Sequence, residues 1–429
     1  MAATANWEQI AVWLVLTAVL LSIVSGRIRN DTAALSGLLL LGLLGIRRPS
    51  ELFSGFSSPA LFTVAMVMTM SAGIVESGIL NGLGRKIAGK IHKPGNQILA
   101  VFLTTGLISA FMNNVGAVGV TLPTAKRMAN RVNVPQAAFG LPIAFASILG
   151  GSMTLIGTAP NLIVSTYRLT AFGEPFRMFD FFSHGLAIFG AGGVVIFLCR
   201  VCGLGPIGGK NSESPIHAQK EQSISEEMPA VCSPKKSILV LLPLFAAVLL
   251  TGLGLVHPSV AFGIVVMLWL AVRILTYKNA LSSFNLPVIL FLGSMFGISA
   301  ALQGTGALGA AISAISPILK TMSPLWLVIL TVFITALFSN ILDNSAAALL
   351  MAPMVVELSS AAGIAVNPDA LLMAVSAGTS LGVIMPTHQA TVVVSSSIEL
   401  SKKSFMKTGV AVVLLAGILS ALVIYAVWR

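Results

Sequence analysis

Four short polar stretches interrupt runs of this sequence that are otherwise apolar. They are centred on Asn113–Asn114, on residues 150–165 (GGSMTLIGTAPNLIVS), on Asp343–Ser345 and on residues 385–391 (MPTHQAT). Glycine and proline break helices, and a broken helix leaves backbone carbonyls free to ligate a cation. Such unpaired groups are tolerated deep in a membrane only where they face protein, water or a bound solute. We therefore expect these stretches to form an ion-binding site.

The composition is that of an integral membrane protein. Of the 429 residues, 56% are hydrophobic and 9% are charged, and the mean hydropathy is +0.95. These values lie far outside the averages of soluble domains. Apolar runs long enough to cross roughly 30 Å of hydrocarbon recur along the chain, and each must be a helix because lipid cannot satisfy free backbone groups. We expect an all-α polytopic membrane protein.

The apolar runs predict about ten full spans. They lie at about residues 7–25, 33–46, 58–80, 137–166, 180–201, 237–256, 258–274, 285–305, 367–398 and 404–428. With the N-terminus outside, 19 of the 25 Lys and Arg residues fall on the inner side. The positive-inside rule therefore places both termini outside. We expect the chain in the cytoplasmic (inner) membrane.

Two further apolar stretches, at about 97–128 and 323–357, have polar centres and do not fit this count. In the first stretch each half has about 15 residues and reaches roughly 22 Å, which is too short to cross the membrane. Basic residues at both ends of the first stretch place its entrance and exit on the inner face. We predict a re-entrant hairpin at each stretch, the second entering from outside.

Glycine, proline and polar residues recur in the same order along the two halves of the chain. Phe56, Pro59 and Gly78 recur 228 positions later as Phe284, Pro287 and Gly306; Asn114 and Pro123 recur 230 positions later as Asn344 and Pro353; Gly150 and Asn161 correspond to Gly378 and Gln389 at 228. Five spans per repeat require the second repeat to be inverted. We predict repeats at 1–202 and 237–429, joined by a polar cytoplasmic linker at 203–236. Their broken helices are expected at about 137–166 and 367–398.

Several other classes of protein are disfavoured. The net charge of +11 comes from basic residues between apolar spans, without the basic, aromatic-lined stripe of a nucleic-acid site. The three cysteines form neither a disulfide framework nor a metal set. No span carries a nucleophile with a base or an H-E-x-x-H pattern, so we expect neither an enzyme nor a cofactor. Paired helix breaks suit alternating access better than an open channel.

The four stretches, read as FMNNVGAVGVTLP, GGSMTLIGTAPNLI, FSNILDNSAAALLMAP and IMPTHQAT, resemble the divalent anion/sodium symporter family of the ion transporter superfamily. The resemblance covers nearly the whole chain and is most specific at residues 150–161. It implies a homodimer in the lipid bilayer. It also implies that each protomer's hairpins and broken helices carry a small anion with sodium by an elevator motion.

The resemblance assigns roles to individual residues. The implied anion ligands are Asn113, Asn114, Asn344, Ser345, Thr387 and Gln389. His388, which is titratable near neutrality and lies beside a helix break, is added as a candidate anion ligand; the alternative is a neutral histidine hydrogen-bonded to backbone. The implied cation ligands are Asn114, Gly157, Thr158, Asn161, Asp343, Asn344, Pro386 and Thr391. Helix N-termini at both hairpin tips are expected to attract the anion. The anion class is sulfate or a di- or tricarboxylate, and the coupling ion is sodium or a proton.

The sequence departs from the family pattern at both tips. Carriers of dicarboxylates typically show Ser-Asn-Thr there, whereas this chain has Met112-Asn113-Asn114 and Asp343-Asn344-Ser345. Asp343 adds a negative charge that needs a cation or a proton. This feature keeps a cation/proton antiporter or an arsenite or other oxyanion efflux permease open as alternatives. His184 and His257 lie at span ends, where we expect them to be solvated or to snorkel towards water.

Overall fold

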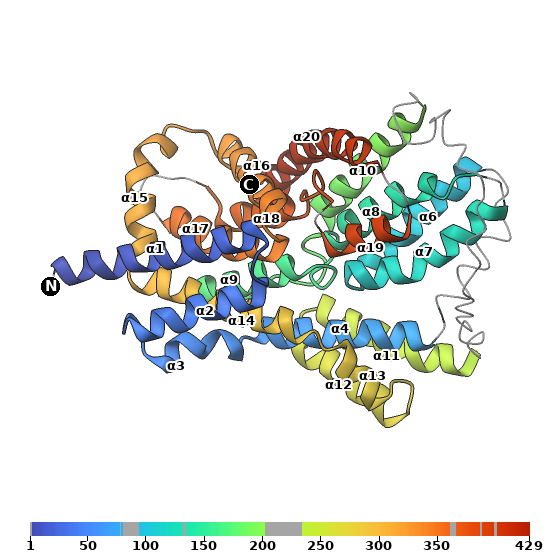
Figure 1. Ribbon diagram of the computed structural model, residues 1–429, viewed down its shortest axis with the longest axis horizontal. Coiled ribbons are helices and arrows are strands. Elements are labelled where there is room, and N and C mark those ends of the chain that lie inside the picture. The colour runs from blue at the N-terminus through green and yellow to red at the C-terminus, as the bar shows by residue number, and fades with distance from the viewer. Residues whose placement is uncertain are drawn as a thin grey trace.

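The computed structural model describes residues 2–77, 79, 94–131, 134–201, 234–360, 366–386, 388–398 and 401–429. Throughout these ranges the regular secondary structure is helical, as expected (Figure 1). The first half contains α1 (Ala2–Ser25), α2 (Asn30–Leu43), α3 (Pro49–Leu52), the 3₁₀ turn η1 (Phe53–Ser57), α4 (Pro59–Ser77), α6 (Pro94–Ser109), α7 (Asn114–Arg131), α8 (Ala137–Gly151), α9 (Ala159–Phe172) and α10 (Phe182–Val201). The second half contains α11 (Pro234–Gly252), α12 (Pro258–Ala271), α13 (Tyr277–Ser283), α14 (Leu286–Gly304), α15 (Ala307–Leu319), α16 (Pro324–Ile341), α17 (Asn344–Ser360), α18 (Pro368–Thr379), α19 (Gln389–Ser397) and α20 (Lys402–Val427).

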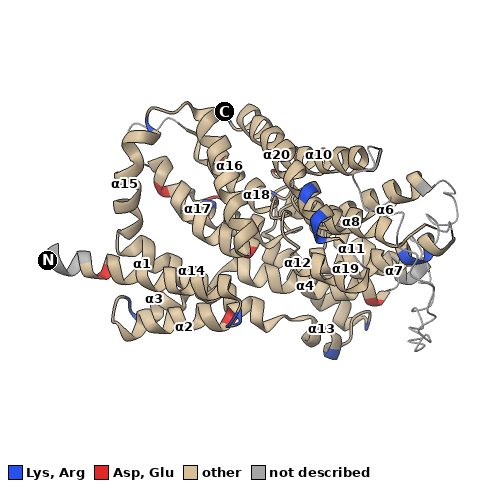
Figure 2. Cartoon of the chain, turned by 45° about the horizontal axis from the view of Figure 1, so that its top comes forward, with Lys and Arg blue, Asp and Glu red and all other residues tan. Residues whose placement is uncertain are grey.

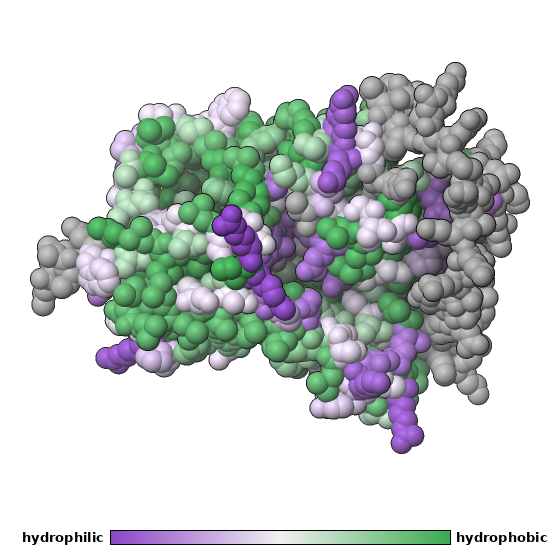
Figure 3. All heavy atoms as spheres, viewed as in Figure 1, coloured by the Kyte–Doolittle hydropathy of each residue, from purple (hydrophilic) through white to green (hydrophobic). Residues whose placement is uncertain are grey.

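Six stretches among the described residues are long and apolar enough to cross a membrane. They are Trp7–Ser25, Pro49–Ser77, Phe182–Cys199, Leu286–Gly304, Pro324–Ile341 and Lys402–Val427. Figure 2 shows that charged residues are sparse and gather near helix ends, and Figure 3 shows broad apolar surfaces between them. The protein is a polytopic membrane protein, as expected. The number of ten crossings stays a prediction.

Two helices differ from the expected pattern. α16 has 18 residues and is long enough, by length and composition, to cross the membrane, whereas we expected it to be one leg of a re-entrant hairpin at 323–357. α15 occupies 13 residues that the predicted spans leave empty. A helix of that length reaches only about 20 Å, so a search for full spans overlooks it. Gly306, with φ of +69°, separates α15 from α14.

The helices form two groups that contact each other along one boundary. One group, the core bundle, contains α6–α10 and α16–α20; its contacts include α10 with α20, α9 with α17 and α18, and α8 with α19. The other group, the frame bundle, contains α1–α4 and α11–α15; here α14 packs on α2 and η1, and α12 packs on α4. Contacts of α4 with α9 and of α14 and α15 with α17 join the two groups.

Helices end at all four polar stretches. α6 and α7 are separated by residues 110–113, and α16 and α17 by residues 342–343. α8 and α9 are separated by residues 152–158, and α18 and α19 by residues 380–388. The core bundle therefore contains four helix breaks. The repeat boundaries at 202 and 236 stay predictions, because residues 202–233 lie outside the described ranges.

Glycine permits a close helix crossing at the same place in both halves. A Cβ added to Gly150 of α8 would lie 2.4 Å from the backbone oxygen of Gly106 in α6. A Cβ added to Gly378 of α18 would lie 2.6 Å from the oxygen of Val332 in α16. These distances leave no room for a methyl group against backbone.

An ion pair joins the two halves within the core bundle. Arg168 of α9 donates to Asp369 of α18 through Nε at 2.8 Å and through Nη2 at 3.0 Å. Arg168 also donates to the carbonyl of Glu174 at 2.9 Å and lies 4.8 Å from the ring centre of Phe176. A bidentate pair of this kind fixes the relative orientation of the two helices.

We expect Gly150→Ala to lower the thermal unfolding temperature in detergent. Alanine favours a helix over glycine by about 1 kcal/mol, but the overlap with Gly106 costs about 1–3 kcal/mol. Gly190→Ala in α10 is the matched control, because a Cβ there meets nothing within 4 Å. Equal unfolding temperatures for the two variants would contradict the close crossing.

Candidate functional site

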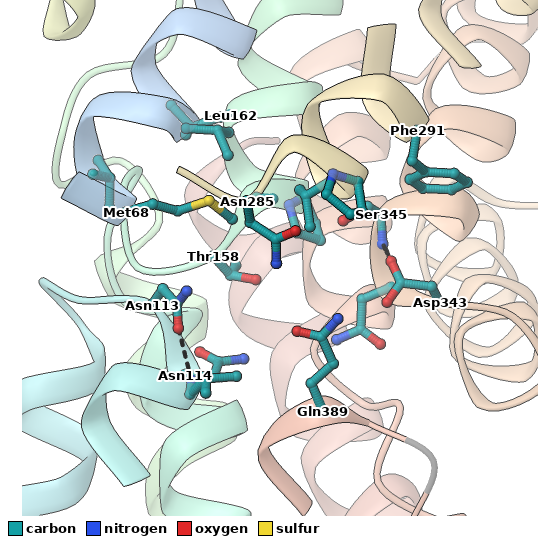
Figure 4. A pocket seen from close by; sticks show the side chains of 18 of the residues that line it. Met68, Asn113, Asn114, Thr158, Leu162, Asn285, Phe291, Asp343, Ser345 and Gln389 are labelled. Carbon is teal, nitrogen blue, oxygen red and sulfur yellow. Dashed lines mark hydrogen bonds between the residues drawn. The ribbon is translucent and has the colours of Figure 1, made fainter. Parts of the chain in front are cut away.

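A cavity of about 350 Å³ lies between the core and frame bundles. The core bundle contributes the helix breaks, including Asn113, Thr158, Asp343 and Gln389, and the frame bundle contributes α4, α14 and the α1–α2 connection. Figure 4 shows polar side chains from different helices turned towards this common space. The cavity is large enough for a small organic or inorganic anion with accompanying ions.

Six of the described helices begin at the cavity. The N-termini of α7, α9, α17 and α19 come from the core bundle, and those of α2 and α14 come from the frame bundle. The first N–H groups of a helix have no intrahelical partner, and the helix dipole is positive at this end. Asn113 Oδ1 accepts from Val115 N at 2.7 Å, and Asp343 Oδ1 accepts from Ser345 N at 2.9 Å. The positive ends of the helix dipoles favour an anion in the cavity.

The two hairpin-tip asparagines are held in the same way. Ser109 Oγ lies 3.1 Å from Asn114 Oδ1 and also contacts the carbonyl of Ser147 at the end of α8. Ser339 Oγ lies 2.7 Å from Asn344 Oδ1 and 2.8 Å from the carbonyl of Thr379 at the end of α18. The serines and the asparagines are each 230 positions apart. Each serine therefore connects a hairpin tip to the neighbouring helix break.

Hydrogen counting fixes the orientation of these amides. A serine hydroxyl has one hydrogen, and a backbone carbonyl can only accept. Each serine hydroxyl must therefore donate to the carbonyl and accept a hydrogen from its asparagine. The amide NH₂ then faces the serine, which exchanges the Oδ1 and Nδ2 positions given above, and the amide oxygen of Asn114 or Asn344 faces away from it. This arrangement offers two oxygen ligands to a cation.

Asn161 is fully buried and does not line the cavity. Its Nδ2 donates to the carbonyls of Thr154 at 2.8 Å and Ser152 at 3.4 Å, and its Oδ1 accepts from Ser376 at 2.7 Å. Asn161 thus satisfies carbonyls that the break between α8 and α9 leaves free. Thr158, by contrast, lines the cavity.

Some residues of the break between α18 and α19 line the cavity and others do not. His388 and Gln389 line the cavity, and both ring nitrogens of His388 are buried without a partner among the described residues. The hydroxyl of Thr391 donates to the carbonyl of His388 at 2.7 Å. Thr391 and Pro386 do not line the cavity, and Thr387 lies outside the described residues.

Most of the implied ligands are therefore brought to one cavity. They are Asn113, Asn114, Gly157, Thr158, Asp343, Asn344, Ser345, His388 and Gln389. The described residues hold no cluster of three or more His, Cys, Asp or Glu side chains that could bind a resident metal. The ligand types suit a dissolved anion and an oxygen-bound cation.

The frame side of the cavity contains charged residues that sequence reasoning missed. Arg29 pairs with Asp31 through two contacts of 3.1 Å, and both residues line the cavity. Asn285 lies at the start of α14 on the same side. The signal was weak, because Arg29 resembles any basic residue that orients a span. The one local sign of a different role was Asp31, an acidic residue two positions later at the start of a helix.

The prediction that His184 is solvated is wrong. The side chain is fully buried, its ring packs against Phe181 at 5.9 Å, and Nε2 lies 3.5 Å from Ser376 Oγ. The reason is that α10 packs on α8 and α20 within the core bundle. His257 lies at the start of α12 and is half-buried, with Nδ1 2.7 Å from Ser259 Oγ.

We expect Ser339→Ala to lower the free energy of unfolding by about 1–3 kcal/mol. The substitution leaves the buried carbonyl of Thr379 and the Asn344 amide without their shared partner. Thermal unfolding in detergent measures the effect. Ser313→Ala is the control, because its hydroxyl bonds an exposed carbonyl within α15. Equal losses in both variants would show that the serine does not hold the tip.

Comparison with known proteins gives a consistent result. The family model described as "CitMHS: Citrate transporter" matches residues 13–378. The uncharacterized transporter YfbS of Escherichia coli is 31% identical over 181 residues, which are 42% of this chain and 29% of YfbS. The 46 kDa membrane protein of Mycobacterium leprae is 25% identical over 370 residues, covering 84% of this chain and 83% of that protein.

Sodium/sulfate cotransporter 1 of Chlamydomonas reinhardtii is 25% identical over 154 residues, which are 34% of this chain and 18% of that protein. The chain therefore matches less than a third of the length of YfbS and of this cotransporter. Among solved structures, the YdaH transporter of Alcanivorax borkumensis matches with a TM-score of 0.60 and 16% identity, covering 88% of each chain. At that identity the match concerns the fold alone.

Proposed function

Because this chain belongs to the CitMHS citrate transporter family, we propose that it is a secondary active transporter that carries a small anion together with sodium. The resemblance to the divalent anion/sodium symporters is confirmed by the family match and by relatives named sodium/sulfate cotransporters. The protein is a membrane transporter. Its anion, coupling ion and mechanism are the subject of the proposal.

The convergence of helix N-termini carries the anion part of this proposal. Six positive helix ends and the guanidinium of Arg29 surround the cavity. An anion that enters can replace the missing partners of several N–H groups at once. Sulfate and di- or tricarboxylates are small enough for the cavity and carry several acceptor oxygens.

Oxygen ligands support the coupled cation. Asp343 lines the cavity and takes part in none of the ion pairs among the described residues. The amide oxygens of Asn114 and Asn344 and the unwound backbone at Gly157 and Thr158 supply neutral ligands. A hard cation such as sodium suits this set, and it would offset the carboxylate charge beside a bound anion.

A second candidate is proton coupling, as in a cation/proton antiporter or an oxyanion efflux permease. The environment of His388 favours this candidate. His388 lines the cavity together with Asp343, and its buried ring nitrogens have no partner among the described residues. A proton moving between these groups would neutralise Asp343 without sodium.

The two-bundle arrangement supports an elevator mechanism. The core bundle holds the four breaks, and the frame bundle supplies the opposite wall of the cavity. In the proposal, α6–α7 and α16–α17 are re-entrant hairpins of the core bundle, which slides against the frame within a homodimer. The protein lies in the cytoplasmic membrane with both termini outside.

We expect proteoliposomes of the purified protein to take up at least one of sulfate, succinate and citrate when an inward sodium gradient is imposed. Radiolabelled uptake with sodium, with potassium and with a proton gradient separates the candidates. Sodium-driven proton flux without any anion uptake would favour the antiporter. Absence of uptake of these anions under every gradient would refute anion symport.

We expect Asp343→Asn to remove the sodium dependence of uptake or to raise the half-saturating sodium concentration at least about tenfold. The substitution removes the charge of one sodium ligand, and a loss of about 1.4 kcal/mol of binding free energy corresponds to a tenfold weaker affinity. Glu174→Gln is the control, because Glu174 is exposed on a loop away from the cavity. Unchanged ion and pH dependence in Asp343→Asn would remove this residue from the coupling site.

A further inference from the structure

The duplication relates two sets of residues in the frame bundle. Arg29 and Asp31 precede and begin α2, and their counterparts 228 positions later are His257 and Ser259 at the start of α12. In each set the first side chain binds the second: Arg29 to Asp31 at 3.1 Å, and His257 Nδ1 to Ser259 Oγ at 2.7 Å. The same local arrangement therefore occurs twice.

The neighbouring frame helices show the same relation. Pro287, Val288 and Phe291 of α14 line the 350 Å³ cavity together with Arg29. We call these four residues the Arg29 station. Their counterparts 228 positions earlier are Pro59, Ala60 and Thr63 of α4, and the counterpart of Arg29 is His257. We call this second set the His257 station.

The His257 station lines a second, much smaller pocket. Its volume is about 20 Å³, and α9 covers it with Leu162, Ser165 and Leu169. Thr63 is fully buried and Ala60 is 5% exposed. The frame bundle thus contains two related stations, one facing the large cavity and one occluded by a core helix.

The core side of the large cavity is more symmetric. Asn113, Asn114 and Val115 line it, and so do their counterparts Asp343, Asn344 and Ser345, 230 positions later. Related residues of the core bundle therefore face a single station of the frame bundle. In a duplicated molecule this arrangement means that the core bundle is displaced towards the Arg29 station.

We propose that the His257 station is a second contact site for the same small anion, and that the four helix breaks face it when the core bundle is displaced to the other side of the membrane. This inference rests on the proposed transport function and adds the residues of the opposite end point. For the breaks to reach this station, α9 must slide off Thr63 and Ala60.

The two stations differ in charge. Arg29 carries a permanent guanidinium charge. His257 Nδ1 lies 3.3 Å from the N–H donor of Ser259, a contact that favours the unprotonated form of that nitrogen. Burial lowers the pKa of His257, which also favours the neutral ring. The anion thus meets a fixed positive charge at one end of its path and a neutral ring at the other.

Cysteine labelling tests the position of the second station. Thr63→Cys and Ala60→Cys are made singly in a chain whose Cys199, Cys202 and Cys232 are replaced by serine, with Val288→Cys as reporter of the Arg29 station. A membrane-impermeant maleimide is added to either side of oriented vesicles. Thr69→Cys is the matched control, since Thr69 is buried in α4 and lines neither station.

We expect Val288→Cys to react from one side, and Thr63→Cys and Ala60→Cys to react from the opposite side. Their rates should be about 10- to 1000-fold below that of Val288→Cys if the opposite state is about 0.1–10% populated. Thr69→Cys should not react. Labelling of Thr63→Cys and Ala60→Cys from the same side as Val288→Cys, or from neither side, would overturn the proposal.

This experiment does not depend on which anion is carried. If the wild-type protein transports none of the tested anions but Thr63→Cys labels from the opposite side, the proposed substrate class fails and the second station stands. If anion uptake is observed but Thr63→Cys and Ala60→Cys never label, the station fails and the transport function stands.

Charge exchange gives a second test that does not use cysteine. We expect His257→Arg to lower the KM for the anion several-fold when the anion is presented from the His257 side, with little change from the other side. Arg29→Gln should raise the KM from the Arg29 side. Arg27→Gln is the control, because Arg27 is exposed on the same connection but does not line the cavity. Equal effects of His257→Arg from both sides would contradict the proposal.

Discussion

The whole arrangement depends on the requirement that every backbone polar group within the membrane has a partner. Four helix breaks place such groups at the centre of an apolar protein, and buried side chains satisfy many of them. Asn161 donates to two carbonyls of the break between α8 and α9. At the break between α18 and α19, Asn340 donates to the carbonyl of Leu381 at 3.0 Å and accepts from the N–H of Ile384 at 2.7 Å. What these amides leave unpaired faces the cavity, so the polar character of the site follows from the broken helices.

The sequence located the breaks well because the breaking residues are also the diagnostic ones. Single prolines such as Pro142 and Pro353 lie inside helices, but clustered polar, glycine and proline residues mark the breaks, so residues near 113, 158 and 343 could be placed without coordinates. The role of Asn161 could not be predicted, since an asparagine beside a break looks the same whether it binds an ion or a carbonyl. Only its position 2.8 Å from Thr154 O and 2.7 Å from Ser376 Oγ distinguishes the two.

Other features escaped because they depend on the packing of distant segments. Arg29 reads as an orienting charge in sequence, and its place beside the cavity follows from the packing of α2 on α14. His184 reads as a residue near the end of a span, but α10 packs on α8 and α20 and buries it. α15 is too short to register as a span. In each case the local pattern is compatible with two environments, and tertiary contacts select one.

The ion pair between Arg168 and Asp369 bears on how the protein is made. α9 is synthesised about two hundred residues before its partner α18, and α8 packs on α19 and α10 on α20. The N-terminal half of the core bundle therefore leaves the ribosome without the surfaces that it will contact. The guanidinium of Arg168 is made before the carboxylate of Asp369 that pairs with it. Docking of α16–α20 on α6–α10 is therefore expected to be a late step in the folding of this chain.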